Sequence, residues 1–158
     1  MLLSLAQAVD ANSFVHAMRD IAWIGAMINV MHLVALSVFA GAFLIVDLRL
    51  LGAALTREPL AEIATQARPW LVGGFWGLVV TGIPQLALQP LKEYYSDLFN
   101  MKIQIMLVAI IFTFVIKQRV TQADEARLGP IWGKLVALAS IALWSGVAIP
   151  ARLIGLVG

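Results

Sequence analysis

Four long apolar runs separated by polar stretches set the pattern of this chain, at roughly residues 22–46, 70–88, 103–116 and 131–156. A helix of about 20 apolar residues crosses the hydrocarbon core of a bilayer. The third run is short for this purpose unless the side chains at its ends snorkel to the interfaces. The pattern predicts an all-α integral membrane protein whose residues 21–158 form a four-helix transmembrane bundle.

The preceding residues 1–20 are more polar and predict helices that do not cross the membrane. Apolar side chains recur at helical spacing over residues 2–9, which predicts a short N-terminal amphipathic helix lying in the membrane interface. Asn12 or Ser13 is expected to cap a second helix, which carries His16 and continues into the first span.

Two local patterns concern the second span. Pro59 begins a possible short amphipathic helix, with Leu60 and Ile63 on one side. Within the span, Gly73 and Gly77 form a small-xxx-small pair, which lets another helix approach closely.

Composition supports a membrane protein and excludes several kinds of site. Of the 158 residues, 61% are hydrophobic and 13% are charged, which is too apolar for a soluble domain. Cysteine is absent, which excludes disulfides, zinc–thiolate sites and iron–sulfur clusters. The 11 Lys and Arg residues are scattered at the ends of the apolar runs. We therefore expect a lipid bilayer as the partner, and no nucleic acid.

The same cations predict the orientation. Seven of them lie in the connections that follow the first and third spans, and four lie on the opposite side. Because positive charge is retained in the cytoplasm, both termini are expected outside it.

His32 is the titratable residue inside the first span, and such residues are candidates for function. On a helix it shares a face with Asn29 and Asp47, whereas Met31 lies about 100° away. Asp47 is expected at the aqueous boundary, about 22 Å from His32 along the axis. Most other polar residues of the spans lie in the half of the bundle on the same side of the membrane as the two chain termini. We therefore expect the opposite half to be almost purely apolar.

A haem b would explain this arrangement, because it needs an axial imidazole, an apolar wall and cations for its propionates. His32 would ligate the iron and Lys102 and Arg152 would meet the propionates. Trp76, Trp144 and the glycines of the second span would form a flat cavity, with Asn29 beside the ligand.

Other interpretations stay open. His16 would be a second ligand only if the chain bends, because a straight helix separates it from His32 by about 24 Å. Copper could bind to His32 with Met31 and Met106, or His32 could be a hydrogen-bonded packing residue. The chain could also be a cofactor-free structural subunit of a membrane complex. No motif for hydrolysis or phosphoryl transfer is present, so any enzymatic activity would be that of a membrane oxidoreductase.

Four segments resemble an uncharacterised bacterial family of four-span membrane proteins, which in turn resembles the copper-resistance protein D superfamily. These segments are HLVALSVFAGAFLIVDLRLLG (32–52), PWLVGGFWGLVVTG (69–82), YYSDLFNMKIQIMLV (94–108) and WSGVAIPARLIG (144–155). The resemblance implies a bacterial inner-membrane protein, which with the charge pattern places both termini in the periplasm.

The resemblance implies two kinds of function. Copper-resistance D proteins are thought to move copper across the inner membrane. The similar HemJ-type protoporphyrinogen oxidases are associated with haem or porphyrin and use an early-span histidine with a lysine, which His32 and Lys102 match. A homo-oligomer is expected, since four short spans bury little surface. If the protein transfers electrons, a redox partner or a quinone would exchange them with it.

Overall fold

A computed structural model describes residues 2–122 and 130–157, and within these ranges the chain is helical without strands. Four helical segments are long and apolar enough to cross a membrane, which confirms the predicted all-α four-helix bundle. The helices in chain order are α1 (Leu2–Asp10), α2 (Ser13–Asp20), α3 (Ala22–Leu51), α4 (Leu60–Leu88), α5 (Pro90–Tyr94), α6 (Asp97–Ile111), the π-helical turn η1 (Phe112–Lys117), α7 (Gln118–Gln122) and α8 (Pro130–Val157).

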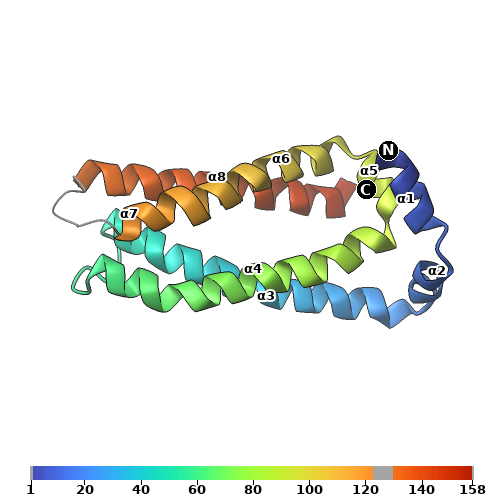
Figure 1. The fold of residues 1–158 in the computed structure, drawn as a ribbon, viewed down its shortest axis with the longest axis horizontal. Coiled ribbons are helices and arrows are strands. Elements are labelled where there is room, and N and C mark those ends of the chain that lie inside the picture. Colours follow the sequence, from blue (N-terminus) through green and yellow to red (C-terminus); the bar gives the residue numbers. More distant parts are fainter. Residues whose placement is uncertain (1, 123–129, 158) are drawn as a thin grey trace.

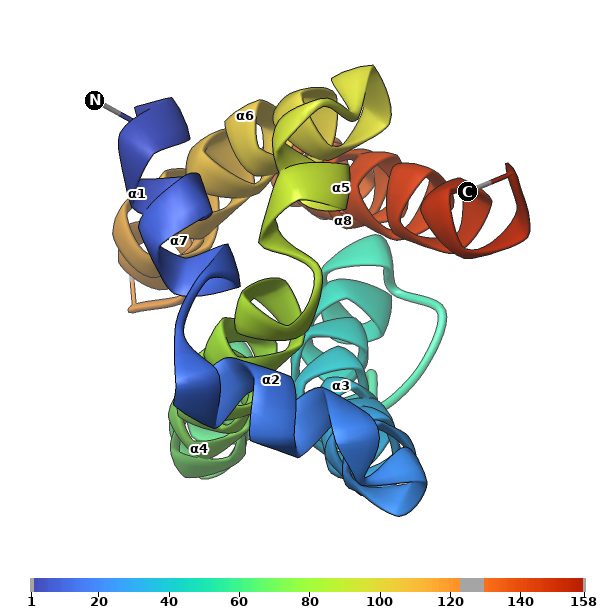
Figure 2. The ribbon, with the colours of Figure 1, turned by 90° about the vertical axis from the view of Figure 1, so that its right-hand side faces the viewer.

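The bundle consists of two helix pairs lying one over the other (Figure 1). One pair is α3 with α4; the other is α8 with the third span, which is α6, η1 and α7 together. The pairs meet mainly where α3 packs on α8 and where α4 packs on α7. Both termini lie at the same end, which α1, α2 and α5 cover (Figure 2). We call this the terminal end, and the opposite end, where residues 52–59 join α3 to α4, the loop end.

Three of the four spans are longer than predicted. The first continues to Leu51, the second begins at Leu60 and the third runs from Asp97 to Gln122. These helices thus extend beyond the predicted spans 22–46, 70–88 and 103–116, whereas α8 coincides closely with the predicted fourth span. Two charged residues at the ends of predicted spans, Asp47 and Lys117, lie within these helices and pair with each other.

The segment before the first span differs from its prediction in one respect. Asn12 caps α2 as expected, with its Oδ1 accepting a hydrogen bond of 2.9 Å from the backbone N–H of Phe14. However, α2 does not continue into the first span, because Ile21 has an extended backbone and separates it from α3. Arg19 explains this turn: its Nε donates to the Leu88 carbonyl at 2.6 Å, which holds α2 against the end of α4.

Glycines of α4 allow α3 to approach closely, but not through the predicted pair. A Cβ on Gly74 would lie 2.7 Å from the backbone nitrogen of Phe39, and one on Gly77 would lie 2.9 Å from the Cβ of Ala35. A Cβ on Gly73 would meet nothing within 4 Å. These glycines therefore serve helix packing, and Gly74 takes the place that the prediction gave to Gly73.

Candidate functional site

His32 is held by a threonine on the neighbouring helix. Its Nδ1 lies 2.7 Å from Oγ1 of Thr81, and that hydroxyl donates its own proton to the carbonyl of Gly77 at 2.6 Å. Because the hydroxyl proton is used in this way, Oγ1 accepts the proton on Nδ1. The lone pair of His32 therefore lies on Nε2, the nitrogen that a metal would use.

Lys102 from the third span belongs to the same region. It is close enough to His32 and to Glu93 for electrostatic interaction, and its Nζ lies 4.7 Å from the ring centroid of Phe99. Among the described residues, no hydrogen bond or ion pair holds its ammonium group. Glu93 Oε2 is likewise buried with no hydrogen-bond partner in the described part of the chain. His32, Thr81, Lys102 and Glu93 form what we call the terminal site.

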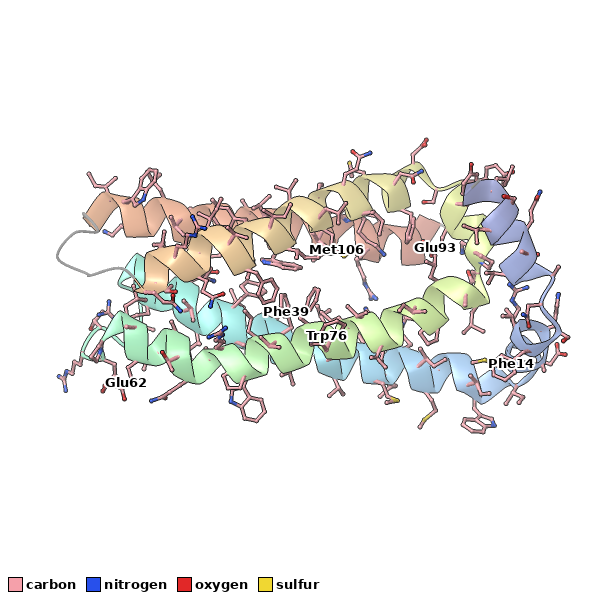
Figure 3. The ribbon with its side chains drawn as sticks, viewed as in Figure 1. Phe14, Phe39, Glu62, Trp76, Glu93 and Met106 are labelled. Atoms are coloured by element: carbon pink, nitrogen blue, oxygen red, sulfur yellow. The ribbon has the colours of Figure 1, made fainter. Side chains whose placement is uncertain are left out.

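Several residues that the sequence placed in the candidate site point outward in the single chain. Asn29 and Arg152 are exposed, and Trp76 is 59% exposed. Met31 on α3 is also exposed, whereas Met106 of α6 is half-buried. Along the length of the bundle, Met106 lies at a level between Glu93 of α5 and Phe39 of α3 (Figure 3).

His16 is exposed on α2, which is separate from the helix of His32. The described residues contain no group of three or more His, Cys, Asp and Glu side chains that could hold a metal ion. The structure thus places His32 within electrostatic range of Lys102, whereas Asn29, Trp76, Arg152, Met31 and His16 are exposed in the single chain.

Trp144 lies buried in an aromatic layer across the middle of the bundle. Its ring is 4.6 Å from that of Phe39 and stacks on Phe43 at 5.8 Å, centroid to centroid. Its indole N–H donates to Oγ1 of Thr113 at 3.0 Å. Phe75 of α4 adds a further ring, 6.4 Å from Phe39. This aromatic layer separates the terminal site from the loop end.

On the loop side of the aromatic layer lies a buried ion pair. Lys117 Nζ is 2.7 Å from Oδ1 of Asp47, and the two side chains are 5% and 0% exposed. The ammonium also donates to the Phe43 carbonyl at 3.1 Å and to Oγ of Ser140 at 3.3 Å. The Ser140 hydroxyl donates to Oδ2 of Asp47 at 2.8 Å. Asp47, Lys117 and Ser140, which we call the loop-end cluster, thus join three spans through one closed polar network.

Regular spacing on each helix builds both layers. Phe43 and Asp47, Thr113 and Lys117, and Ser140 and Trp144 are each four residues apart. The first, third and fourth spans therefore each contribute one residue at the level of the aromatic layer and one to the loop-end cluster. On the third span, both members lie in the π-helical turn η1. π-Helical turns are rare in proteins, but those that occur often lie at functional sites.

The loop-end cluster overturns two expectations from the sequence. Asp47 is fully buried rather than at the aqueous boundary, and the loop-end half of the bundle is not purely apolar. The sequence feature that could have indicated this cluster was the shortness of the predicted third span. A 14-residue apolar run extends to a full span only if Lys117 enters the membrane, and a buried lysine requires an acidic partner.

Comparison with known proteins gives a family match over most of the chain. The model of a family of unknown function, DUF6644, matches residues 18–157. No curated protein and no solved structure matches the chain.

Proposed function

The chain belongs to the DUF6644 family, and we propose from its own chemistry that it binds haem b through His32 and serves in electron transfer at the periplasmic face. The observation that carries this proposal is the pairing of His32 with Thr81. A histidine that ligates a metal through one ring nitrogen commonly has the other nitrogen held by a hydrogen bond, which fixes the tautomer and the ring orientation. Thr81 provides this hydrogen bond and leaves Nε2 as the ligand.

The cation near His32 also fits a haem. Lys102 makes no ion pair among the described residues, although Glu93 lies within electrostatic range of it. An ammonium group in a membrane span is further stabilised by an anion in direct contact. A propionate would be such an anion. When bound, the haem would supply the one-electron chemistry, while this chain would supply the axial imidazole and the compensating charge.

The exposed members of the predicted site suggest an assembly. Trp76, Asn29 and Arg152 would contact a cofactor only between neighbouring copies of the chain. We therefore propose a homo-oligomer in the bacterial inner membrane, in which another copy could provide a second axial ligand. A quinone or a redox protein would exchange electrons with the haem.

Absorption spectra of the detergent-purified protein test this proposal. We expect a Soret band and dithionite-dependent changes in the native protein, loss of the Soret band in His32→Ala, and its retention in the matched control His16→Ala. Thr81→Val should lower the haem affinity by roughly 10- to 100-fold, because it removes the partner that orients the ring. The proposal fails if the native protein lacks the Soret band or if His32→Ala leaves it unchanged.

The same preparation distinguishes two other hypotheses. Stoichiometric copper that depends on His32, Met31 and Met106 would support copper binding or transport. A stoichiometric partner protein, without haem or copper, would support a structural subunit; the closed network of the loop-end cluster is compatible with such a role.

A further inference from the structure

The loop-end cluster has properties of a site that exchanges protons. We propose that Asp47 with Lys117 and Ser140 binds a proton from the aqueous phase at the loop end, and that the π-helical turn η1 moves in response. This inference does not depend on what His32 binds, because the aromatic layer separates the two sites.

The position of the cluster determines which aqueous phase it reaches. Asp47 lies four residues before the end of α3, and Lys117 lies five residues before the end of α7. At about 1.5 Å per residue, both lie within about 8 Å of their helix ends. Toward the terminal end, the cluster adjoins the buried aromatic side chains of Phe39, Phe43 and Trp144, which offer no group that accepts a proton. A proton therefore arrives from the loop end.

The charges around Asp47 are few. Among the described residues, Lys117 is the charged group that acts on it, and Ser140 is its hydrogen-bond donor. The helices packed around the cluster carry other charged residues, most of which are exposed. Arg49 of α3 donates to the Glu58 carbonyl at 2.8 Å. The exposed ones are Glu62 and Arg68 of α4, Arg119 of α7 and Lys134 of α8.

Protonation would remove one half of the ion pair. A proton from water bonds to a carboxylate oxygen of Asp47, the carboxyl group becomes neutral, and Lys117 keeps its own proton. The cluster then carries one unbalanced positive charge in apolar surroundings, which is costly. The long stem of Lys117 allows its ammonium group to move toward the loop-end interface.

The π-helical turn provides a route for this movement. A π-helical turn holds more backbone per turn than an α-helix, and η1 places Thr113 and Lys117 against α8 and α3. If η1 relaxes to α-helical geometry, the residues after it rotate by roughly 100° relative to α6. That rotation withdraws Lys117 from Asp47. The ion pair thus holds η1 in its π-helical form, and protonation releases it.

Spin labels can detect this rotation, because the chain contains no cysteine and single cysteines can be introduced without background. We would label Arg119→Cys, which follows η1, in the full chain in lipid nanodiscs. The matched control is Leu107→Cys, an exposed position of α6 before η1. The readout is the collision rate of each label with oxygen, which partitions into lipid, and with a water-soluble nickel chelate.

We expect acidification to change the accessibility of the label at position 119 and to leave that at position 107 unchanged. Asp47→Asn should show the acidic-form accessibility at every pH. Ser140→Ala is the milder variant; its transition should occur at higher pH, because the carboxylate loses a hydrogen bond. The proposal is overturned if the label at position 119 does not respond to pH, if both labels respond alike, or if the transition persists in Asp47→Asn.

Discussion

At the scale of single residues, hydroxyl groups complete the polar contacts within the spans. Thr81 links His32 to the Gly77 carbonyl, and Ser140 links Asp47 to Lys117. In hydrocarbon an unsatisfied polar group costs several kcal/mol, and these hydroxyl groups reduce that cost for His32, Asp47 and Lys117. The sequence identified His32 but not its partner, because serine and threonine are common in apolar runs and their spacing carries no signal. Only the packing of α3 against α4 shows that Thr81 lies opposite His32.

The loop-end cluster allows a prediction about the ion pair. Lys117→Met leaves the carboxylate of Asp47 buried and unpaired, and should lower the free energy of unfolding by about 3–5 kcal/mol. The double variant Asp47→Leu with Lys117→Met should be less destabilised than Lys117→Met alone, because it removes both charges. Denaturation in detergent micelles measures both. If both variants are destabilised equally, the unpaired charge of Asp47 is not the main cause of the lost stability.

Neighbouring glycines provide a second prediction. Gly74→Ala should lower the free energy of unfolding by about 1–3 kcal/mol, because its Cβ would overlap the backbone of Phe39 and push α3 from α4. Gly73→Ala is the matched control and should not destabilise, since its Cβ meets open space. Thermal unfolding of the two variants in detergent tests this. Similar midpoints would mean that α3 and α4 do not approach as closely as described.

At the scale of elements, polar contacts of Arg19 help to fasten the short helices at the terminal end. Its side chain donates to the Leu88 carbonyl at 2.6 Å and to the Asp10 carboxylate at 2.7 Å. Both partners of the ion pair are about one third exposed, so the pair contributes little to global stability. The effect of Arg19 should be local, because its two contacts join α2 to α1 and to the end of α4.

Arg19→Ala should therefore speed amide hydrogen exchange in α1 and α2 while leaving exchange in α3 and α4 nearly unchanged. Arg57→Ala, in the connection at the loop end, serves as the control and should leave α1 and α2 protected as in the native protein. Hydrogen exchange followed by mass spectrometry measures both variants. A uniform change along the chain after Arg19→Ala would mean that this arginine supports the whole bundle.

At the scale of the whole molecule, the membrane makes the architecture predictable. Four runs of sufficient apolar length leave little choice but four spanning helices, and an even number of spans brings both termini to one side. Hydropathy could not locate the ends of these helices, because it counts Asp47 and Lys117 as polar wherever they lie. Pairing between distant segments makes them part of the spans. The same long-range pairing forms the loop-end cluster, which was not predicted, whereas His32 and Lys102 are candidates that the sequence itself offers.

Orientation is a prediction at this scale. The excess of Lys and Arg after the first and third spans predicts a cytoplasmic loop end and a periplasmic terminal end. Alkaline phosphatase, which is active only after export, should be active when fused after residue 158 and inactive when inserted in residues 52–59. A cytoplasmic fluorescent reporter should give the reverse pattern. Phosphatase activity at the loop end alone would reverse the orientation and place the His32 region at the cytoplasmic face.

The ion pair also has a consequence for the order in which the protein is made. Asp47 belongs to the first span and Lys117 to the third, so the ribosome must add about 70 residues before the carboxylate has its partner. At 5–20 residues per second this takes roughly 4–14 s. During that time the α3–α4 hairpin can already associate through Gly74 and Gly77, but Asp47 has no cation to pair with in the lipid. The first span should therefore insert with Asp47 still at the water boundary, and move to its final depth only when the third span arrives.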